Sequence, residues 1–468
     1  MKFSEHFGLD YSAQTEWFDL ILNLDTKLFI DPFLIYASED GHFEGSHDYI
    51  VSYFNDVFTL IASSKGEKNS VSWKKSQGLL LFPEAEEFKL GYAKMGKPGA
   101  GSGAGFAKII GDSLWEAITA GKEELQHFEE IGILREGIGA DRISDITATI
   151  LKERFVSYTE QICTELKIKT KPFTYNRGSY NPEYLRRGLL KCSLPVNPDN
   201  GMPILLTPKK YIRDLPTISA DDFWNYCYDN ENEMLRNDFG QDITRNVDKK
   251  TIIKLATKRP DLRAEYIACI EETDPEPYNL HADKRGYFRW YEDSKHYCAS
   301  NPLDLHFLDR EEFQKCIESI VSQFQNYVEN NGGWNLLWND DKSPKSEEAS
   351  QFLMQGIVMH WCKASNIDIS REVNIGRGPV DFKVSQGHAH RALLELKLAK
   401  NSKFWNGLSK QLPKYQEAEG IDIGYFIIVL QTDKDIKRLN KIQERVESVR
   451  EATGYDIKHV ICRSLDLI

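Results

Sequence analysis

Two stretches near the C-terminus, residues 380–384 and 393–398, carry apolar side chains at every second position. Residues i and i+2 of an extended chain point to the same face, so this alternation predicts two β-strands with one face turned to a core. The polar segment between them, residues 385–390, contains a glycine and is typical of a hairpin connection. The residues expected to face the core are Val380, Phe382, Val384, Leu394, Leu396 and Leu398.

The opposite face of the same two strands would hold Asp381, Glu395 and Lys397. Two carboxylates brought together across paired strands repel each other unless a cation neutralises them. Hard oxygen donors of this kind favour Mg²⁺ or Mn²⁺. Such an ion polarises a phosphoryl oxygen and lowers the pKa of a bound water, and a neighbouring lysine can position that water or help to deprotonate it. The pattern therefore predicts a site that hydrolyses phosphodiester bonds.

These residues resemble the PD-(D/E)XK, or restriction-endonuclease-like, nuclease superfamily. Pro379-Val380-Asp381 and Glu395-Leu396-Lys397 stand for its two signature elements. The resemblance implies an α/β fold, in which a mixed sheet is flanked by helices, for residues 336–468. A larger N-terminal region of mixed α/β character and unknown fold would precede this core.

The resemblance also implies an acid on a helix upstream of the first strand. Glu347 and Glu348 both open an amphipathic pattern there, and Glu348 is favoured because it lies one turn from Phe352 on the expected inward face. Downstream, Gln411 and Tyr415 lie four residues apart, as in the glutamine-plus-tyrosine helix of many members. Pro413 stands between them, where proline would kink a helix.

The strands and helices expected in this core follow the order helix, three strands, helix, strand, helix, strand. Its last three elements are a buried strand over residues 424–430, a charged amphipathic helix over 435–450 and a strand over 456–462. The resemblance gives Asp381 and Glu395 the role of metal ligands and places Lys397 beside the attacking water. It gives Glu348 a supporting role at the metal and assigns Gln411 to orienting the site or its substrate.

The function implied is a metal-dependent endonuclease, with DNA favoured over RNA as the substrate. A role as effector in a prokaryotic restriction or anti-phage system follows by analogy with the superfamily. Two alternatives stay open: a structure-selective repair or recombination nuclease, and a non-catalytic scaffold that binds nucleic acid through a nuclease-like fold. A homodimer is a further hypothesis, because cutting both strands of a duplex generally needs two sites.

Charge is divided unevenly along the chain. Residues 331–468 carry roughly +2, which leaves roughly −14 on the first 330 residues of a chain with a net charge of −12. The acidic part therefore favours a protein partner or a small-ligand activator over general nucleic-acid binding. Five basic residues would surround the nuclease site and meet phosphates: Arg391, Lys397, Lys400, Lys403 and Lys410.

The length of 468 residues predicts two or three domains. The expected division is an N-terminal region over residues 1–305, a connecting helix within 306–335 and a nuclease domain over 336–468. That helix shows apolar residues at helical spacing from Arg310 to Glu329 and is followed by Asn330-Asn331-Gly332-Gly333.

The N-terminal region offers four weaker signals. The glycine-rich segment 96–105 could cradle a phosphate, but a surface linker is favoured because no Walker ending follows it. Asp25 and Asp31 are interpreted as turn-capping acids beside Pro32 rather than as functional acids. Ser144 or Asp145 is expected to cap a helix. The aromatic stretch 287–291 could stack bases, or could belong to an ordinary core.

Several classes of protein are disfavoured by composition. The eight cysteines contain no C-x-x-C pair and are interpreted as reduced thiols in a cytoplasmic protein. No apolar run approaches the roughly twenty residues that span a bilayer, so no membrane association is expected. His388 and His390 are two residues apart in the hairpin loop, which is weak spacing for a metal site and would also suit phosphate contacts.

Overall fold

The described part of the chain covers most of the sequence. The computed structural model describes residues 1–36, 38, 41–91, 102–119, 127–230, 235, 247–283, 287–307, 309–339, 343–365, 367–374 and 379–464. Most of the glycine-rich segment 96–105 falls outside these residues, as do Gly376-Arg377-Gly378 ahead of Pro379 and the basic residues Lys284 and Arg285.

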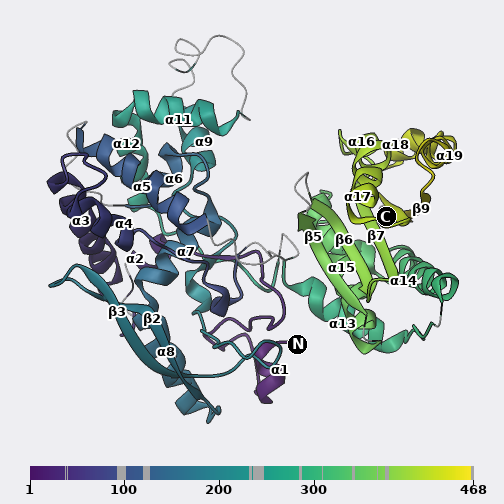
Figure 1. Cartoon of the computed structure of the whole chain (residues 1–468), viewed down its shortest axis with the longest axis horizontal. Helices are drawn as coiled ribbons and strands as arrows, with labels where there is room; N and C mark the ends of the chain where they lie inside the picture. The colour runs from purple at the N-terminus through teal and green to yellow at the C-terminus, as the bar shows by residue number, and fades with distance from the viewer. Residues whose placement is uncertain are drawn as a thin grey trace. The chain divides into compact units, whose positions relative to one another are not determined.

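The described residues form two compact units, one ending at Tyr278 and the other beginning at Asn279 (Figure 1). The second unit therefore starts earlier than the expected boundary at residue 305. Its first helix, α13 (Arg289–Ser300), packs along α15 (Glu347–Ala364), which accounts for the earlier start. The segment expected to be a connecting helix, α14 (Arg310–Asn330), contributes Phe313, Ile317 and other residues to the core beneath the sheet.

The first unit is rich in helices and contains two small antiparallel sheets of two strands each. One sheet pairs β1 (Phe29–Ile30) with β4 (Ile212–Arg213), and the other is the hairpin of β2 (Lys171–Asn181) and β3 (Arg186–Leu194). Its helices are α1 (Phe3–Phe7), α2 (Pro32–Tyr36), α3 (Ser46–Ser63), α4 (Val71–Leu79), α5 (Ser102–Thr119), α6 (Glu130–Leu134), α7 (Ala140–Ile150), α8 (Lys152–Glu165), α9 (Ala220–Asn230), α11 (Lys249–Lys258) and α12 (Pro260–Glu271).

Two sequence interpretations in the first unit meet different outcomes. Asp31 accepts a hydrogen bond from the backbone nitrogen of Phe33 at 3.1 Å, as expected of an acid beside Pro32 at the start of α2. The capping role expected of Ser144 or Asp145 is wrong, because α7 begins earlier, at Ala140. Both side chains instead accept backbone hydrogen bonds from distant segments, Ser144 from Ile30 at 3.0 Å and Asp145 from Ala85 at 3.1 Å.

A five-stranded mixed sheet organises the second unit, with the strands in the order β5-β6-β7-β8-β9. The first three strands are antiparallel neighbours, and β7, β8 and β9 run parallel. The strands are β5 (Asp368–Asn374), β6 (Pro379–Gln386), β7 (His390–Leu398), β8 (Ile423–Leu430) and β9 (Asp456–Arg463). Helices α16 (Phe404–Asn406) and α17 (Leu412–Glu419) precede β8, and α18 (Asp433–Ile436) and α19 (Ile442–Thr453) precede β9.

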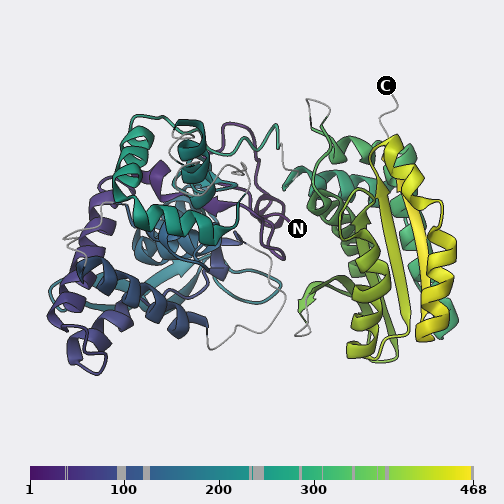
Figure 2. The ribbon, with the colours of Figure 1, turned by 90° about the horizontal axis from the view of Figure 1, so that it is seen from above.

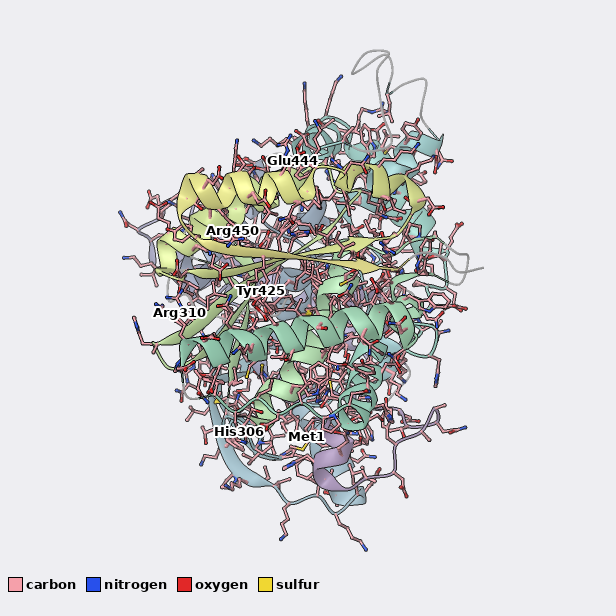
Figure 3. All side chains as sticks on the ribbon, turned by 90° about the vertical axis from the view of Figure 1, so that its right-hand side faces the viewer. Met1, His306, Arg310, Tyr425, Glu444 and Arg450 are labelled. Atoms are coloured by element: carbon pink, nitrogen blue, oxygen red, sulfur yellow. The ribbon has the colours of Figure 1, made fainter. Side chains whose placement is uncertain are left out.

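Helices cover both faces of this sheet (Figure 2), so the predicted α/β class and order of elements are confirmed. Phe382, Leu394 and Leu396 face the side of α13, α14 and α15, whereas Leu393 faces the side of α17 and α19. Figure 3 shows the outer strand β9 between α14, which begins at Arg310, and α19, which carries Glu444 and Arg450. The expected helix over 435–450 is divided in two: Asp435 forms a capping box with Thr432 at the start of the short α18, and α19 begins at Ile442.

The aromatic stretch 287–291 belongs to the core of the second unit. Tyr287 and Trp290 are buried and pack against Phe352 of α15, with the Trp290 and Phe352 rings stacked 5.7 Å apart. These two rings are therefore not available to stack bases. Among the described residues, no helix is both long enough and apolar enough to cross a membrane.

Candidate active site

Strands β6 and β7 form a hairpin, and they separate at its open end, away from the turn. Their pairing runs from Gln386 opposite His390 to Phe382 opposite Leu394, and it stops there. Beyond Phe382, β6 continues to pair with β5, through Val380 opposite Val373. The separation leaves the edge of β7 beyond Leu394 without a strand partner on this side, and buried backbone N–H groups need partners.

Two carboxylates take the place of the missing strand. Asp381 accepts a hydrogen bond from the backbone nitrogen of Leu396 at 2.7 Å. Glu347, the first residue of α15, accepts one from the backbone nitrogen of Leu398 at 3.0 Å. Because each bond is made to an ionisable oxygen, it is stronger than an ordinary bond between strands. The split in the sheet therefore fixes two acids beside the end of β7.

Lys397 lies among three carboxylates that come from three different elements. Its Nζ atom is 3.0 Å from Oε1 of Glu395, 3.1 Å from Oε1 of Glu347 and 3.5 Å from Oδ2 of Asp381. Asp381, Glu395 and Lys397 are all buried rather than solvated, although they occupy the polar face predicted from the alternation. The structure thus brings together the three signature residues.

Burial and mutual repulsion shape the electrostatics of this cluster. Burial, reinforced by the charge of Asp381, raises the pKa of Glu395 to about 8, even though Lys397 works in the opposite direction. Burial opposes the charge of Lys397, but Asp381, Glu395 and Glu347 outweigh it and raise the pKa of the amine above its usual value. Lys397 is therefore an ammonium ion at neutral pH in this arrangement.

The donors fit a hard divalent cation in their chemistry. Asp381 and Glu395 offer the oxygen ligands that Mg²⁺ and Mn²⁺ prefer, and Oε2 of Glu395 is buried without a hydrogen-bond partner among the described residues. When all are ionised, three carboxylates face one ammonium, and a divalent ion would balance the remaining charge. In the part of the chain that the structure describes, no set of three His, Cys, Asp or Glu side chains is already arranged around a metal position. Lys397 lies between these carboxylates instead.

The helix acid that reaches Lys397 is Glu347, and not the favoured Glu348. Glu348 is favoured in the sequence because it lies one turn from Phe352, which is expected to face the sheet. Phe352 instead packs toward α13, against Tyr287 and Trp290. The face directed at the split is the one defined by Glu347 and Gln351, which are one turn apart. Glu348, next along the helix, is half-buried.

The amide side chains of Gln351 and Asn401, which were not predicted as site residues, hold Asp381 and Glu347 in place. Nε2 of Gln351 donates to Oδ1 of Asp381 at 2.9 Å, and Nδ2 of Asn401 donates to Oε2 of Glu347 at 2.8 Å. Asp381 and Glu347 are thus each held by an amide side chain as well as by Lys397. The sequence feature that could have indicated Gln351 is its position one helical turn after Glu347, on the same face of α15.

Gln411 and Tyr415 approach the same cluster from the helical segment after β7. They share a side-chain hydrogen bond, and burial, followed by the charges of Glu395 and Asp381, raises the pKa of Tyr415. Oε1 of Gln411 is buried without a partner in the described structure. Pro413 lies in the first turn of α17, directly after a π-helical turn over residues 407–411.

The predicted ring of basic residues is only partly present. Lys400, Lys403 and Lys410 are exposed on the segments that follow β7. Arg391 lies at the other end of β7 and donates to the backbone oxygens of Glu419 and Gly420 at the C-terminus of α17, at 3.0 and 3.1 Å. Its expected place beside the site is therefore wrong, and it satisfies helix carbonyls instead.

The remaining candidates lie elsewhere. His390 is at the far end of the hairpin, where its ring packs 5.0 Å from Phe307 and 5.6 Å from Phe313. His388 is exposed in the turn between β6 and β7. The side chain of Glu372 on β5 lies outside the described residues.

Two family models match the chain, and each is described as a domain of unknown function. Domain of unknown function (DUF8370) matches residues 8–219, and Domain of unknown function (DUF8371) matches residues 313–433. No curated protein matches the chain, and no solved structure does. The second matched region includes every residue of the cluster around Lys397.

Proposed function

We propose that the second unit is a metal-dependent nuclease that hydrolyses phosphodiester bonds. The observation that carries the proposal is the convergence of Asp381, Glu395 and Glu347 on Lys397 where β6 and β7 separate. Buried charges are costly, and clusters that perturb each other's pKa are concentrated at functional sites. The resemblance of the two signature elements to PD-(D/E)XK nucleases supports the same conclusion.

Asp381 and Glu395 would hold the divalent ion, because the one is anchored by Gln351 and the other keeps a buried oxygen without a partner. The ion, when bound, supplies Lewis-acid polarisation of the phosphoryl group and a more acidic water. Lys397 would orient that water and offset negative charge in the transition state, a role that its raised pKa favours over proton abstraction.

Glu347 would act as a positioning residue for Lys397, because its other oxygen is tied to Leu398 and Asn401. Gln411 would orient the substrate or the attacking water through its buried Oε1. DNA is the proposed substrate by resemblance, and a role as the effector of a restriction or anti-phage system is proposed on the same ground.

The test is cleavage by the purified full-length chain of supercoiled plasmid, linear duplex, single-stranded DNA and RNA. Reactions contain Mg²⁺, Mn²⁺ or EDTA, with Asp381→Asn and Lys397→Met beside the unaltered protein. We expect cutting that needs the divalent ion and that both variants lose by at least about 100-fold. Cutting that persists equally in both variants, or in EDTA, would reject the site. Ion-dependent binding of nucleic acid without cleavage would identify a scaffold instead.

A further inference from the structure

The hairpin of β2 and β3, taken together with residues 167–170 that lead into it, concentrates positive charge in an otherwise acidic part of the chain. Residues 167–191 contain seven Lys or Arg and a single acid, Glu183, whereas the whole chain has a net charge of −12. In Figure 1 the hairpin forms a long ribbon beside α8. Such a concentration raises the local positive potential even when the net charge of the protein is negative.

Two of the seven cations anchor the hairpin to the body of the first unit. Arg187 donates to the hydroxyl of Tyr53 at 3.1 Å and to the backbone oxygen of Thr149 at 3.3 Å. Arg177 donates to the backbone oxygen of Gly78. The ribbon is therefore held in one position on α3, α4 and α7.

The other five cations are exposed, and none of them forms an ion pair with a carboxylate of the described residues. They are Lys167, Lys169, Lys171, Arg186 and Lys191. Elsewhere in the first unit several exposed or buried cations do have acidic partners, as Lys68 has Asp112 and Arg263 has Glu130. The hairpin thus presents cations that the fold leaves to solvent.

The shape of the hairpin separates an anchored face from an open one. Cys192 and Leu194 are buried on one face of β3, whereas Lys191 and Ser193 on the alternate positions are exposed, and Lys191 lies opposite the exposed Thr174. Three residues of β2 bulge out between Tyr175 and Ser179. Gly178 permits this, because a Cβ there would lie 2.4 Å from Cβ of Leu190.

An aromatic side chain stands beside the cations at the turn of the hairpin. Tyr184 is 54% exposed, and the guanidinium carbon of Arg186 lies 5.2 Å from the centre of its ring. Asn181 fixes the turn by accepting a hydrogen bond from the backbone nitrogen of Tyr184 at 3.0 Å. An exposed tyrosine among unpaired cations matches surfaces that meet both the phosphates and the sugars or bases of nucleic acid.

We propose that the β2–β3 hairpin is a docking surface for the phosphate backbone of duplex nucleic acid. A polyanion complements five unpaired cations, and a two-stranded ribbon is one of the shapes that the major groove of DNA admits. This surface lies in the first unit, whereas the nuclease is proposed for the second unit, so the two proposals concern different parts of the chain. The hairpin adds a local basic surface to a part of the chain whose net acidity favours a protein partner or a small-ligand activator.

The test is the binding of a fluorescent 30-base-pair duplex to the full-length protein in EDTA, measured by anisotropy over a range of salt concentrations. The variant combines Lys169→Gln, Lys171→Gln and Lys191→Gln. Its matched control combines Lys65→Gln, Lys108→Gln and Lys250→Gln, three lysines that are exposed in the first unit outside the hairpin. Because EDTA prevents metal-dependent cutting, the result does not depend on whether the proposed nuclease is active.

We expect the hairpin variant to bind at least about tenfold more weakly than the unaltered protein, with a plot of log K against log salt that is shallower by about 2 to 3. The control should keep the affinity and slope of the unaltered protein, and Arg186→Gln alone should reduce the slope by about 1. Equal losses in the two triple variants, or no binding of duplex by the unaltered protein, would overturn the proposal. Displacement of the duplex by poly-glutamate at the same charge concentration would also overturn it, in favour of an acidic protein partner.

Discussion

Glu347 and Lys397 are fifty residues apart in the sequence, and Oε1 of the one lies 3.1 Å from Nζ of the other. The second oxygen of Glu347 accepts hydrogen bonds from the backbone of Leu398 and the side chain of Asn401. Glu347 therefore connects the start of α15 to Lys397 and to two residues that follow it in the chain. This relationship makes the position of the lysine depend on a residue outside the two signature strands.

The first prediction separates two adjacent glutamates. Glu347→Gln removes the charge that holds Lys397, so we expect cleavage to fall by roughly 10- to 100-fold while the fold is retained. Glu348→Gln changes the neighbouring side chain and should keep activity within about threefold of the unaltered protein. Rates of plasmid cleavage for the two variants measure the difference. A larger loss in the Glu348 variant would return the role to the residue favoured by the sequence.

The second prediction concerns the charge balance of the cluster. Lys397→Met leaves Asp381 and Glu347 without their common counterion, and we expect a loss of stability of about 3 kcal/mol, since uncompensated buried charges are costly. Millimolar Mg²⁺ should restore part of that stability without restoring cleavage, because an ion that binds only the folded state stabilises it. Thermal unfolding with and without Mg²⁺ reads this out, and Lys410→Met serves as the control at an exposed lysine. Absence of Mg²⁺ stabilisation in both variants would contradict a cation site at the cluster, because both keep Asp381 and Glu395.

The sequence predicted the signature face of the hairpin because strand periodicity depends only on local spacing. Phe382, Leu394 and Leu396 lie in the core, and Asp381, Glu395 and Lys397 share the other face, as alternation required. That polar face is buried rather than open to solvent, because α17 and the segment before it cover the sheet there. Periodicity distinguishes two faces but not what lies above each of them.

The choice between Glu347 and Glu348 could not be made from one helix alone. An amphipathic pattern shows which residues are apolar, and α15 has apolar partners on two sides, the sheet and α13. Phe352 lies on the α13 side of the helix. A prediction based on Phe352 therefore selects Glu348, one residue after the glutamate that reaches Lys397. Likewise, the roles of Gln351 and Asn401 arise from the separation of β6 and β7, and sequence spacing does not encode where two paired strands diverge.

The third prediction uses a glycine that lies against the lysine. A Cβ at Gly407 would be 3.1 Å from both Cγ of Lys397 and Cε2 of Phe426, so Gly407→Ala must displace one of these side chains by a few tenths of an ångström. We expect cleavage to drop roughly tenfold through the shifted lysine, with a modest loss of stability. Gly78→Ala is the control, because Gly78 lies inside α4 with nothing within 4 Å of the added atom. It should be neutral or stabilising by up to about 1 kcal/mol. If Gly407→Ala kept full activity, the contact would not set the position of Lys397.

The fourth prediction tests two adjacent glutamates of the first unit. Both are buried, but Glu130 pairs with Arg263, whose Nε atom lies 3.1 Å from its Oε2. Burial raises the pKa of Glu129 from 4.5 to about 8, with smaller contributions from Asp31 and Glu130. Between these two values the unfolded chain has released the proton of Glu129 and the folded chain has kept it. The free energy of unfolding therefore falls as pH rises, by up to about 1.4 kcal/mol per pH unit for this group.

Glu129→Gln removes that dependence, because glutamine imitates the protonated acid at every pH. The variant should match the unaltered protein near pH 4.5 and should become progressively more stable than it toward pH 8. Glu130→Gln should instead lose roughly 3 kcal/mol at neutral pH, because it leaves the buried Arg263 without its carboxylate. Urea denaturation at pH 5, 6.5 and 8 measures both variants. A stability difference for Glu129→Gln that did not change with pH would mean that Glu129 is ionised in the folded protein, and its burial would then require a counterion close to its carboxylate.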